Sequence, residues 1–263
     1  MKKPLRIIIV LSIIVLAVVG NVVRRHATVS GVEVRIDYNG ADTLVTAKTV
    51  EDYMAQRMPK LRSMLVKEVD KRALERLVSS SDYLLSCDVW VSMAGKVVVE
   101  AVQRCPIVRV FYGDKEFYID ETGAVVPLSG EGDCNVLVAS GIFRQTLPAD
   151  VSAIRLNEWA QDSVRMRYDL TKVWLLADYL WRDEVERDCY DQIYLDAKGD
   201  MHLTPRSENY DINLGSAASL DEKFRHIETF RAKVVPVKGN DAYSQLILKY
   251  KGQIVCRKRE QNN

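Results

Sequence analysis

The sequence predicts an α+β protein built from one apolar N-terminal helix, a β-α-α-β-β domain and a mostly antiparallel β domain with flanking helices. Three observations predict this fold class. Residues 7–23 carry no charged side chain, residues 28–104 mix strand-like alternation with helix-like periodicity, and residues 105–259 consist mainly of short apolar runs between glycine turns. Short tails at residues 1–6 and 260–263 complete the chain.

The apolar run at the N-terminus predicts a single transmembrane helix over residues 7–23. Such a helix would be about 26 Å long, close to the thickness of the hydrocarbon core of a bilayer. A cleavable signal peptide is the alternative, but no small-x-small cleavage site follows the run, and Arg24 and Arg25 come directly after it. Because long domains translocate largely regardless of charge, we expect residues 1–6 in the cytoplasm and the bulk of the chain outside the inner membrane.

The domain at residues 28–104 begins with a strand and two helices. Apolar and polar side chains alternate over residues 32–37, which predicts a half-buried strand. Apolar residues then recur at helical spacing over 46–58 and 69–78, and Thr46 or Thr49 is suited to cap the first helix. Two further strands, joined by a turn at Gly95, complete the domain and are predicted at residues 85–92 and 96–103.

The second domain is predicted to be mainly β-structure, with two helices at residues 171–185 and 220–233. Its strands are predicted from short apolar or alternating runs at residues 108–111, 116–119, 124–127, 135–139, 192–205, 209–214, 243–250 and 253–257.

Two of its turns share the pattern Tyr-apolar-Asp-x-x-Gly, starting at Tyr118 and at Tyr194. We expect Asp120 and Asp196 to open hairpin turns in which the glycine supplies a positive φ. A catalytic pair or a calcium site is the alternative, but neither aspartate has the further oxygen ligands that a calcium loop concentrates within a dozen residues.

Composition and motifs argue against most kinds of chemistry. The net charge of +1 indicates no nucleic-acid partner. The five cysteines have no C-x-x-C spacing, so neither a zinc site nor a disulfide framework is predicted, and Cys105–Cys134 is the one pair to test. Nucleotide-binding and hydrolase motifs are absent from the sequence. We therefore predict no catalytic, cofactor-binding or metal-binding residue. A membrane-anchored cell-wall enzyme, the alternative, would need His202, Asp196 and Asp120 to converge in one cleft.

Two motifs resemble the FtsQ/DivIB family of bacterial cell-division proteins. An alternating strand ends in the Arg-x-Pro of residues 104–106 and leads to a Tyr-x-Asp-x-x-Gly-x-x-x-Pro segment at residues 118–127. The second motif is the strand Tyr243–Tyr250, followed by Gly252 and a further strand. Arg104 and Pro106 would mark the domain junction, where Pro106, which has no N–H to donate, would end the pairing of the preceding strand.

Family resemblance implies a POTRA domain at residues 28–104 and an FtsQ-type β domain at 105–259. It also implies a non-enzymatic scaffold of the divisome, in the inner membrane at the septum with its bulk in the periplasm. Such proteins bind FtsB-like and FtsL-like bitopic partners, meet further divisome partners on the POTRA side, and link them to septal peptidoglycan synthesis. A POTRA-containing secretion or assembly factor is an alternative, which would need several POTRA repeats or a long β-barrel.

The resemblance, together with the alternation near the chain end, suggests where a partner would bind. If the strand at 243–250 borders the sheet, its unpaired backbone groups can accept a partner strand, assisted by the helix at 220–233. Equally, this strand could form an internal hairpin with residues 253–257. Lysines make the region basic, so the partner should carry acids. The predicted partner-binding residues are Tyr243, Ser244, Leu246, Leu248, Lys249, Tyr250 and Lys251.

Overall fold

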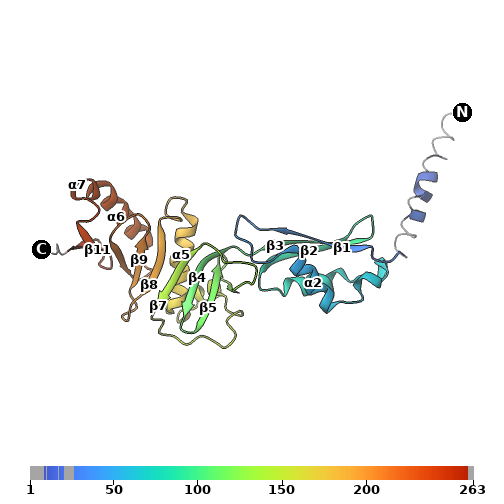
Figure 1. The fold of residues 1–263 in the computed structure, drawn as a ribbon, viewed down its shortest axis with the longest axis horizontal. Coiled ribbons are helices and arrows are strands. Elements are labelled where there is room, and N and C mark those ends of the chain that lie inside the picture. Colours follow the sequence, from blue (N-terminus) through green and yellow to red (C-terminus); the bar gives the residue numbers. More distant parts are fainter. Residues whose placement is uncertain (1–8, 10, 17, 21–26, 260–263) are drawn as a thin grey trace. The chain divides into compact units, whose positions relative to one another are not determined.

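The computed structural model describes residues 9, 11–16, 18–20 and 27–259. It is an α+β protein that divides into two compact units, Met1–Arg104 (unit 1) and Cys105–Asn263 (unit 2). Each unit has its own β-sheet (Figure 1). Each also has its own hydrophobic core.

The predicted membrane-spanning helix is contradicted by the structure. Among the described residues, no helix combines the length and the apolar composition that a bilayer crossing requires. A crossing takes about 20 helical residues, and the described positions of the predicted span are residues 9, 11–16 and 18–20. The other positions of the predicted span (7, 8, 10, 17 and 21–23) and the predicted tails at 1–6 and 260–263 lie outside the described residues. The fold class is corrected accordingly to α+β with mixed sheets.

Unit 1 has the element order β-α-α-β-β, as its sequence pattern predicts. The elements are β1 (Gly31–Asp37), α2 (Ala47–Arg57), α3 (Lys71–Ser79), β2 (Leu84–Val91) and β3 (Lys96–Gln103), with short 3-10 turns at Leu61–Ser63 and Val66–Glu68. The strand order is β1-β3-β2, in which β3 runs parallel to β1 and antiparallel to β2.

Local sequence determines where the helices of unit 1 begin and which face they bury. Thr46 caps α2 by accepting a hydrogen bond from the backbone N–H of Thr49 at 3.2 Å, as the sequence predicts. Val50 and Met54, one turn apart on the same face of α2, are buried in the core. That core also contains Leu74 and Val78 of α3 and Val97, Val99 and Ala101 of β3.

At the junction, β3 ends at Gln103, and the backbone N–H of Arg104 donates to Tyr83 O at 2.9 Å. Pro106 is already the first residue of the next strand, where it lies opposite Asp120. A proline fits there because the first residue of a strand need not donate to the ladder.

Unit 2 contains a nine-stranded sheet with the order β12-β11-β10-β9-β8-β7-β4-β5-β6. Its strands are β4 (Pro106–Tyr112), β5 (Lys115–Asp120), β6 (Val125–Pro127), β7 (Leu137–Gly141), β8 (Tyr190–Leu195), β9 (Met201–Pro205), β10 (Asp211–Gly215), β11 (Tyr243–Ile247) and β12 (Val255–Lys258). Its helices are α4 (Leu156–Gln161), α5 (Asp169–Arg182), α6 (Leu220–Lys233) and α7 (Val235–Lys238), and a 3-10 turn covers Arg165–Arg167.

This sheet is mixed, although five of its eight strand pairs are antiparallel, as the expectation of a mostly antiparallel domain requires. The pairs β4–β7, β7–β8 and β10–β11 are parallel. Parallel neighbours need a long crossover connection, and the chain supplies helical crossovers by α4 and α5 between β7 and β8 and by α6 between β10 and β11. The predicted helices are therefore crossover elements of the sheet.

The core of unit 2 lies between the sheet and its helices. Leu176 and Leu180 of α5 and Ile227 and Phe230 of α6 are buried in one cluster with Ile193, Leu203, Ile212 and Leu246 of the strands. Figure 1 shows α5 and α6 beside these strands. The alternate positions along β8 to β11 are more polar, with Gln192, His202, Asn213 and Gln245 among them.

Candidate protein-interaction site

The predicted partner strand is not the border of the sheet. β11 pairs with β10 on one side, where Leu246 lies opposite Ile212, and with β12 on the other, where Leu246 lies opposite Cys256. The hairpin with residues 253–257, one of the two interpretations of the sequence, is the arrangement that the structure adopts. The border is β12, one strand further along the chain.

β12 is the more exposed of the two ends of this sheet. Three of its four residues are exposed, whereas Val125 and Val126 of β6 at the opposite end are buried. An end strand presents unpaired N–H and C=O groups on its outer side, which a strand of another chain can satisfy. β12 therefore offers a position for strand addition.

The predicted site residues divide into a packing group and a surface group. Leu246 and Leu248 are buried, Tyr243 packs edge-on against Phe230 at a ring distance of 5.7 Å, and the Ser244 hydroxyl donates to Arg257 O at 3.4 Å. These four residues hold the hairpin in place. The surface group, Lys249, Tyr250 and Lys251, is exposed in the connection between β11 and β12 (residues 248–254, the β11–β12 loop).

The β11–β12 loop lies against the start of α6. The two enclose a pocket of about 170 Å³, which Tyr250, Lys223 and His226 help to line. Gly252 turns the chain with φ +67°, and its N–H donates to Glu222 Oε1 at 3.2 Å. These contacts attach the loop to α6, the helix that the sequence associates with the partner strand.

Lys223 fixes the other wall of this pocket. Its side chain is buried, and its ammonium donates to Leu214 O and Ser216 O, each at 2.7 Å. Burial lowers the pKa of Lys223. Sequence reasoning missed this residue because a lysine within a helical pattern is normally read as part of a solvated face.

The exposed side chains around β12 combine positive charge with apolar surface. Arg257 and Lys258 are exposed on the strand, Lys251 is exposed in the loop, and Tyr250 and Val255 are 51% and 41% exposed. Sequence reasoning recognised the basic character and left open whether the strand at 243–250 borders the sheet or pairs with residues 253–257. A partner that fits would add a strand carrying acidic and apolar side chains.

The three residues that an enzyme would need do not all meet in one cleft: His202 Nε2 lies 3.5 Å from Asp196 Oδ2, but Asp120 lies elsewhere. Asp120 accepts hydrogen bonds within its own turn, from Thr122 N at 2.9 Å and Ala124 N at 2.8 Å. It lies at the end of β5, four strands away from the β9 residue His202, which separates them by about 19 Å at the usual strand spacing. Asp196 forms the same kind of turn, with Gly199 at φ +79°, so the predicted role of both aspartates in turns is confirmed.

Within the described part of the chain, none of the five cysteines is joined in a disulfide, including the pair Cys105 and Cys134. Among the described residues, no group of three or more histidine, cysteine and carboxylate side chains could hold a metal ion.

His202 forms an ion pair that reaches toward this border. Its Nδ1 lies 2.7 Å from Asp211 Oδ2, its Nε2 lies 3.5 Å from Asp196 Oδ2, and Gln245 of β11 donates to the same Asp211 oxygen at 2.8 Å. The hydrogen bond with Asp211 raises the pKa of His202, with burial acting in the opposite direction and Asp196 adding to the increase. The protonated imidazole of His202 thus links β9 to Asp211 of β10, and the same Asp211 carboxylate links β10 to β11.

We expect the stability of unit 2 to fall as the pH rises above neutrality. The pKa of His202 is higher in the folded than in the unfolded state, where it is about 6.5. Protonated His202 therefore contributes its full stabilisation below the unfolded pKa, and this contribution is lost as the pH rises through the folded pKa. Urea unfolding at pH 6 and pH 9 measures the effect. His202→Gln should lose much of the pH difference, whereas His226→Gln should keep it. An identical pH difference in the wild type and His202→Gln would contradict the assignment.

Comparison with known families agrees with the fold of unit 2. Residues 105–257 match the family described as FtsQ/DivIB, C-terminal related. This match covers more than half of the 263 residues of the chain and spans the nine-stranded sheet except for Lys258, the last residue of β12. No curated protein matches the chain.

Proposed function

The chain belongs to the FtsQ/DivIB family of non-enzymatic bacterial cell-division proteins, and from this premise we propose that it is a divisome scaffold that recruits its partners at the β12 border. The partners would be FtsB-like and FtsL-like division proteins, and the place of action would be the division septum. The observation that carries the proposal is that β12, an exposed and basic end strand, closes the sheet that matches the family.

Two kinds of interaction would contribute to partner binding at this site. Backbone pairing with β12 would supply affinity, since it depends little on side chains. Tyr250, Val255 and the basic groups Lys249 and Lys251 would supply selectivity for an acidic and partly apolar strand. The proposal keeps the predicted surface residues and moves the pairing from β11 to β12.

Unit 1 would serve as a second docking domain. Its β-α-α-β-β order and its parallel β1–β3 pair support its assignment as a POTRA domain. Further divisome proteins would bind there, while the link to septal peptidoglycan synthesis would pass through the partners on β12.

Charge reversal in the β11–β12 loop tests the proposal. We expect Lys249→Glu with Lys251→Glu to weaken binding of the source bacterium's purified FtsB-like protein about 10- to 100-fold, because like charges would then face each other across the added strand. The equilibrium dissociation constant, measured by calorimetry, gives the effect. The loss should shrink at high salt, since exposed charges are screened.

Lys48→Glu with Lys71→Glu is a matched control, because it changes the net charge equally at two exposed positions of unit 1. Backbone pairing is tested separately by hydrogen exchange, in which the amides of residues 255–258 should become protected in the complex. Unchanged affinity in the loop variant, together with unchanged exchange in β12, would rule out this site.

A further inference from the structure

Groups outside the partner site hold Lys249 in position. Its ammonium lies 3.1 Å from Asp200 Oδ2, in the turn between β8 and β9, and the two side chains are 32% and 22% exposed. Behind the same residue lies Gly215, where a Cβ atom would stand 2.6 Å from the Cβ of Lys249. Just before it, the backbone N–H of Leu248 donates to Asn213 O at 2.8 Å. The start of the β11–β12 loop therefore rests on β10 and on the β8–β9 turn.

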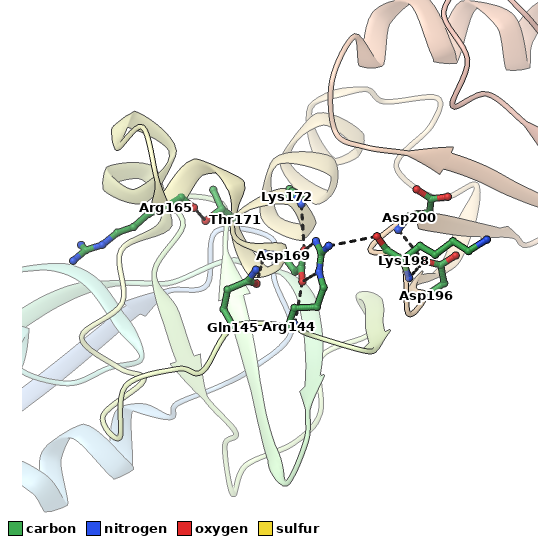
Figure 2. Close-up of polar contacts among 9 residues, drawn as sticks. All are labelled: Arg144, Gln145, Arg165, Asp169, Thr171, Lys172, Asp196, Lys198 and Asp200. Carbon is green, nitrogen blue, oxygen red and sulfur yellow. Dashed lines mark hydrogen bonds and ion pairs between the residues drawn. The ribbon is translucent and has the colours of Figure 1, made fainter.

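The β8–β9 turn is itself well defined (Figure 2). The Asp196 carboxylate accepts from the backbone N–H groups of Lys198 at 2.8 Å and Asp200 at 2.9 Å. Gly199 has φ +79°, a conformation that side chains with a Cβ disfavour. These contacts fix the backbone of Asp200 and so the direction from which its carboxylate approaches Lys249.

Arg144 fastens this turn to the body of unit 2. One guanidinium nitrogen donates to Lys198 O at 3.4 Å, and a Cβ on Gly199 would stand only 2.3 Å from the Arg144 Cζ. The guanidinium is anchored in turn by Asp169, whose fully buried carboxylate accepts from Arg144 Nε at 2.9 Å. Figure 2 shows Arg144 between Asp169 and the turn.

We propose that Asp200 is a positioning residue of the partner site, which holds the β11–β12 loop in its binding conformation through Lys249. A loop that is ordered before the partner arrives loses less conformational entropy on binding. The inference rests on the proposed function for what the loop binds, while the positioning itself is a property of the free protein. Asp200 would thus influence affinity from a turn that precedes β11 by some forty residues.

Removing the Asp200 charge tests the inference in the free protein first. We expect Asp200→Asn to speed amide hydrogen exchange of residues 249–252 about 3- to 10-fold, while the melting temperature stays within the error of the wild type, because a single ion pair near the surface contributes little to global stability. Affinity for the FtsB-like protein should fall several-fold. If Asp200 only stabilised the fold as a whole, Asp200→Asn would lower the melting temperature, and exchange in the loop would rise no more than exchange in the rest of unit 2.

Asp191→Asn is the matched control. Asp191 forms a more exposed pair with Arg206 at 2.8 Å, on β8 but outside the turn and the loop. This variant should leave both loop exchange and affinity unchanged. Exchanging the charges, Asp200→Lys with Lys249→Asp, should restore slow exchange in the loop.

The outcomes separate the two proposals. Loop exchange in Asp200→Asn equal to that in Asp191→Asn would overturn the positioning role. Faster exchange with unchanged affinity would overturn the part of Asp200 in partner binding. If the wild-type protein itself does not bind the FtsB-like protein, the proposed function fails, and loop exchange still decides whether Asp200 positions the loop.

Discussion

Arg231→Met should destabilise unit 2 by about 3–5 kcal/mol, because it leaves two largely buried carboxylates without their cation. Arg231 on α6 donates to both Glu186 oxygens at 2.9 and 3.1 Å and to Glu208 at 2.7 Å. The buried Tyr190 hydroxyl completes the network by donating to Glu186 at 2.7 Å. Burial by itself would lower the pKa of Arg231, but the surrounding Tyr190, Glu208 and Glu186 raise it, so Arg231 stays protonated.

Urea unfolding at pH 7 measures this loss. Arg225→Met is the control, since Arg225 lies on the same helix, is exposed and donates to Asp221 O of that helix at 3.2 Å. Adding Glu186→Gln to Arg231→Met should recover part of the stability by removing one uncompensated charge. A loss under about 1 kcal/mol for Arg231→Met would show that the network contributes little to the fold.

Arg144→Met should lower the free energy of unfolding of unit 2 by about 3 kcal/mol. Asp169 is fully buried, and without the guanidinium its negative charge would be only partly balanced. Asp169 accepts from the Arg144 backbone N–H at 3.0 Å and Lys172 Nζ at 3.2 Å in addition to the guanidinium. Burial acts to raise the pKa of Asp169, but the hydrogen bonds from Arg144 and Lys172 outweigh it and lower that pKa.

The lowered pKa gives this prediction a signature in acid. A carboxylate with a depressed folded pKa stabilises the fold above its unfolded pKa of about 3.9, and the stabilisation is lost as the pH falls through the folded value. In Arg144→Met this loss should begin at higher pH than in the wild type, as urea unfolding between pH 3 and pH 7 would show. Arg182→Met, which removes an exposed pair with Asp178 on the same helix, should leave the acid profile unchanged.

Local features of the fold could be predicted from the sequence, because they depend on neighbouring residues. Thr46 caps a helix through an N–H three residues away, and Asp120 and Asp196 bind amides within their own turns. The apolar stripe that buries Val50 and Met54 likewise follows from spacing alone.

What the sequence could not predict depends on residues far apart in the chain. The alternation of Tyr243–Ile247 is the same whether the strand borders the sheet or lies inside it, and only the pairing with β12 decides. Arg144 and Asp169 are 25 residues apart, and Arg231 and Glu186 are 45 apart. The N-terminal apolar run shows a different limit, since composition alone predicted a membrane crossing that the described helices do not support.

The positive charge of β12 also bears on self-association. An exposed end strand is a template for pairing with another copy of the same chain. If two β12 strands met edge to edge, the exposed Arg257 and Lys258 of one copy would face those of the other, and like charges directly opposite are destabilising. The charges that would select an acidic partner therefore also oppose homodimers and edge-to-edge aggregation. The end strand of the sheet can then remain exposed without pairing with further copies of the chain.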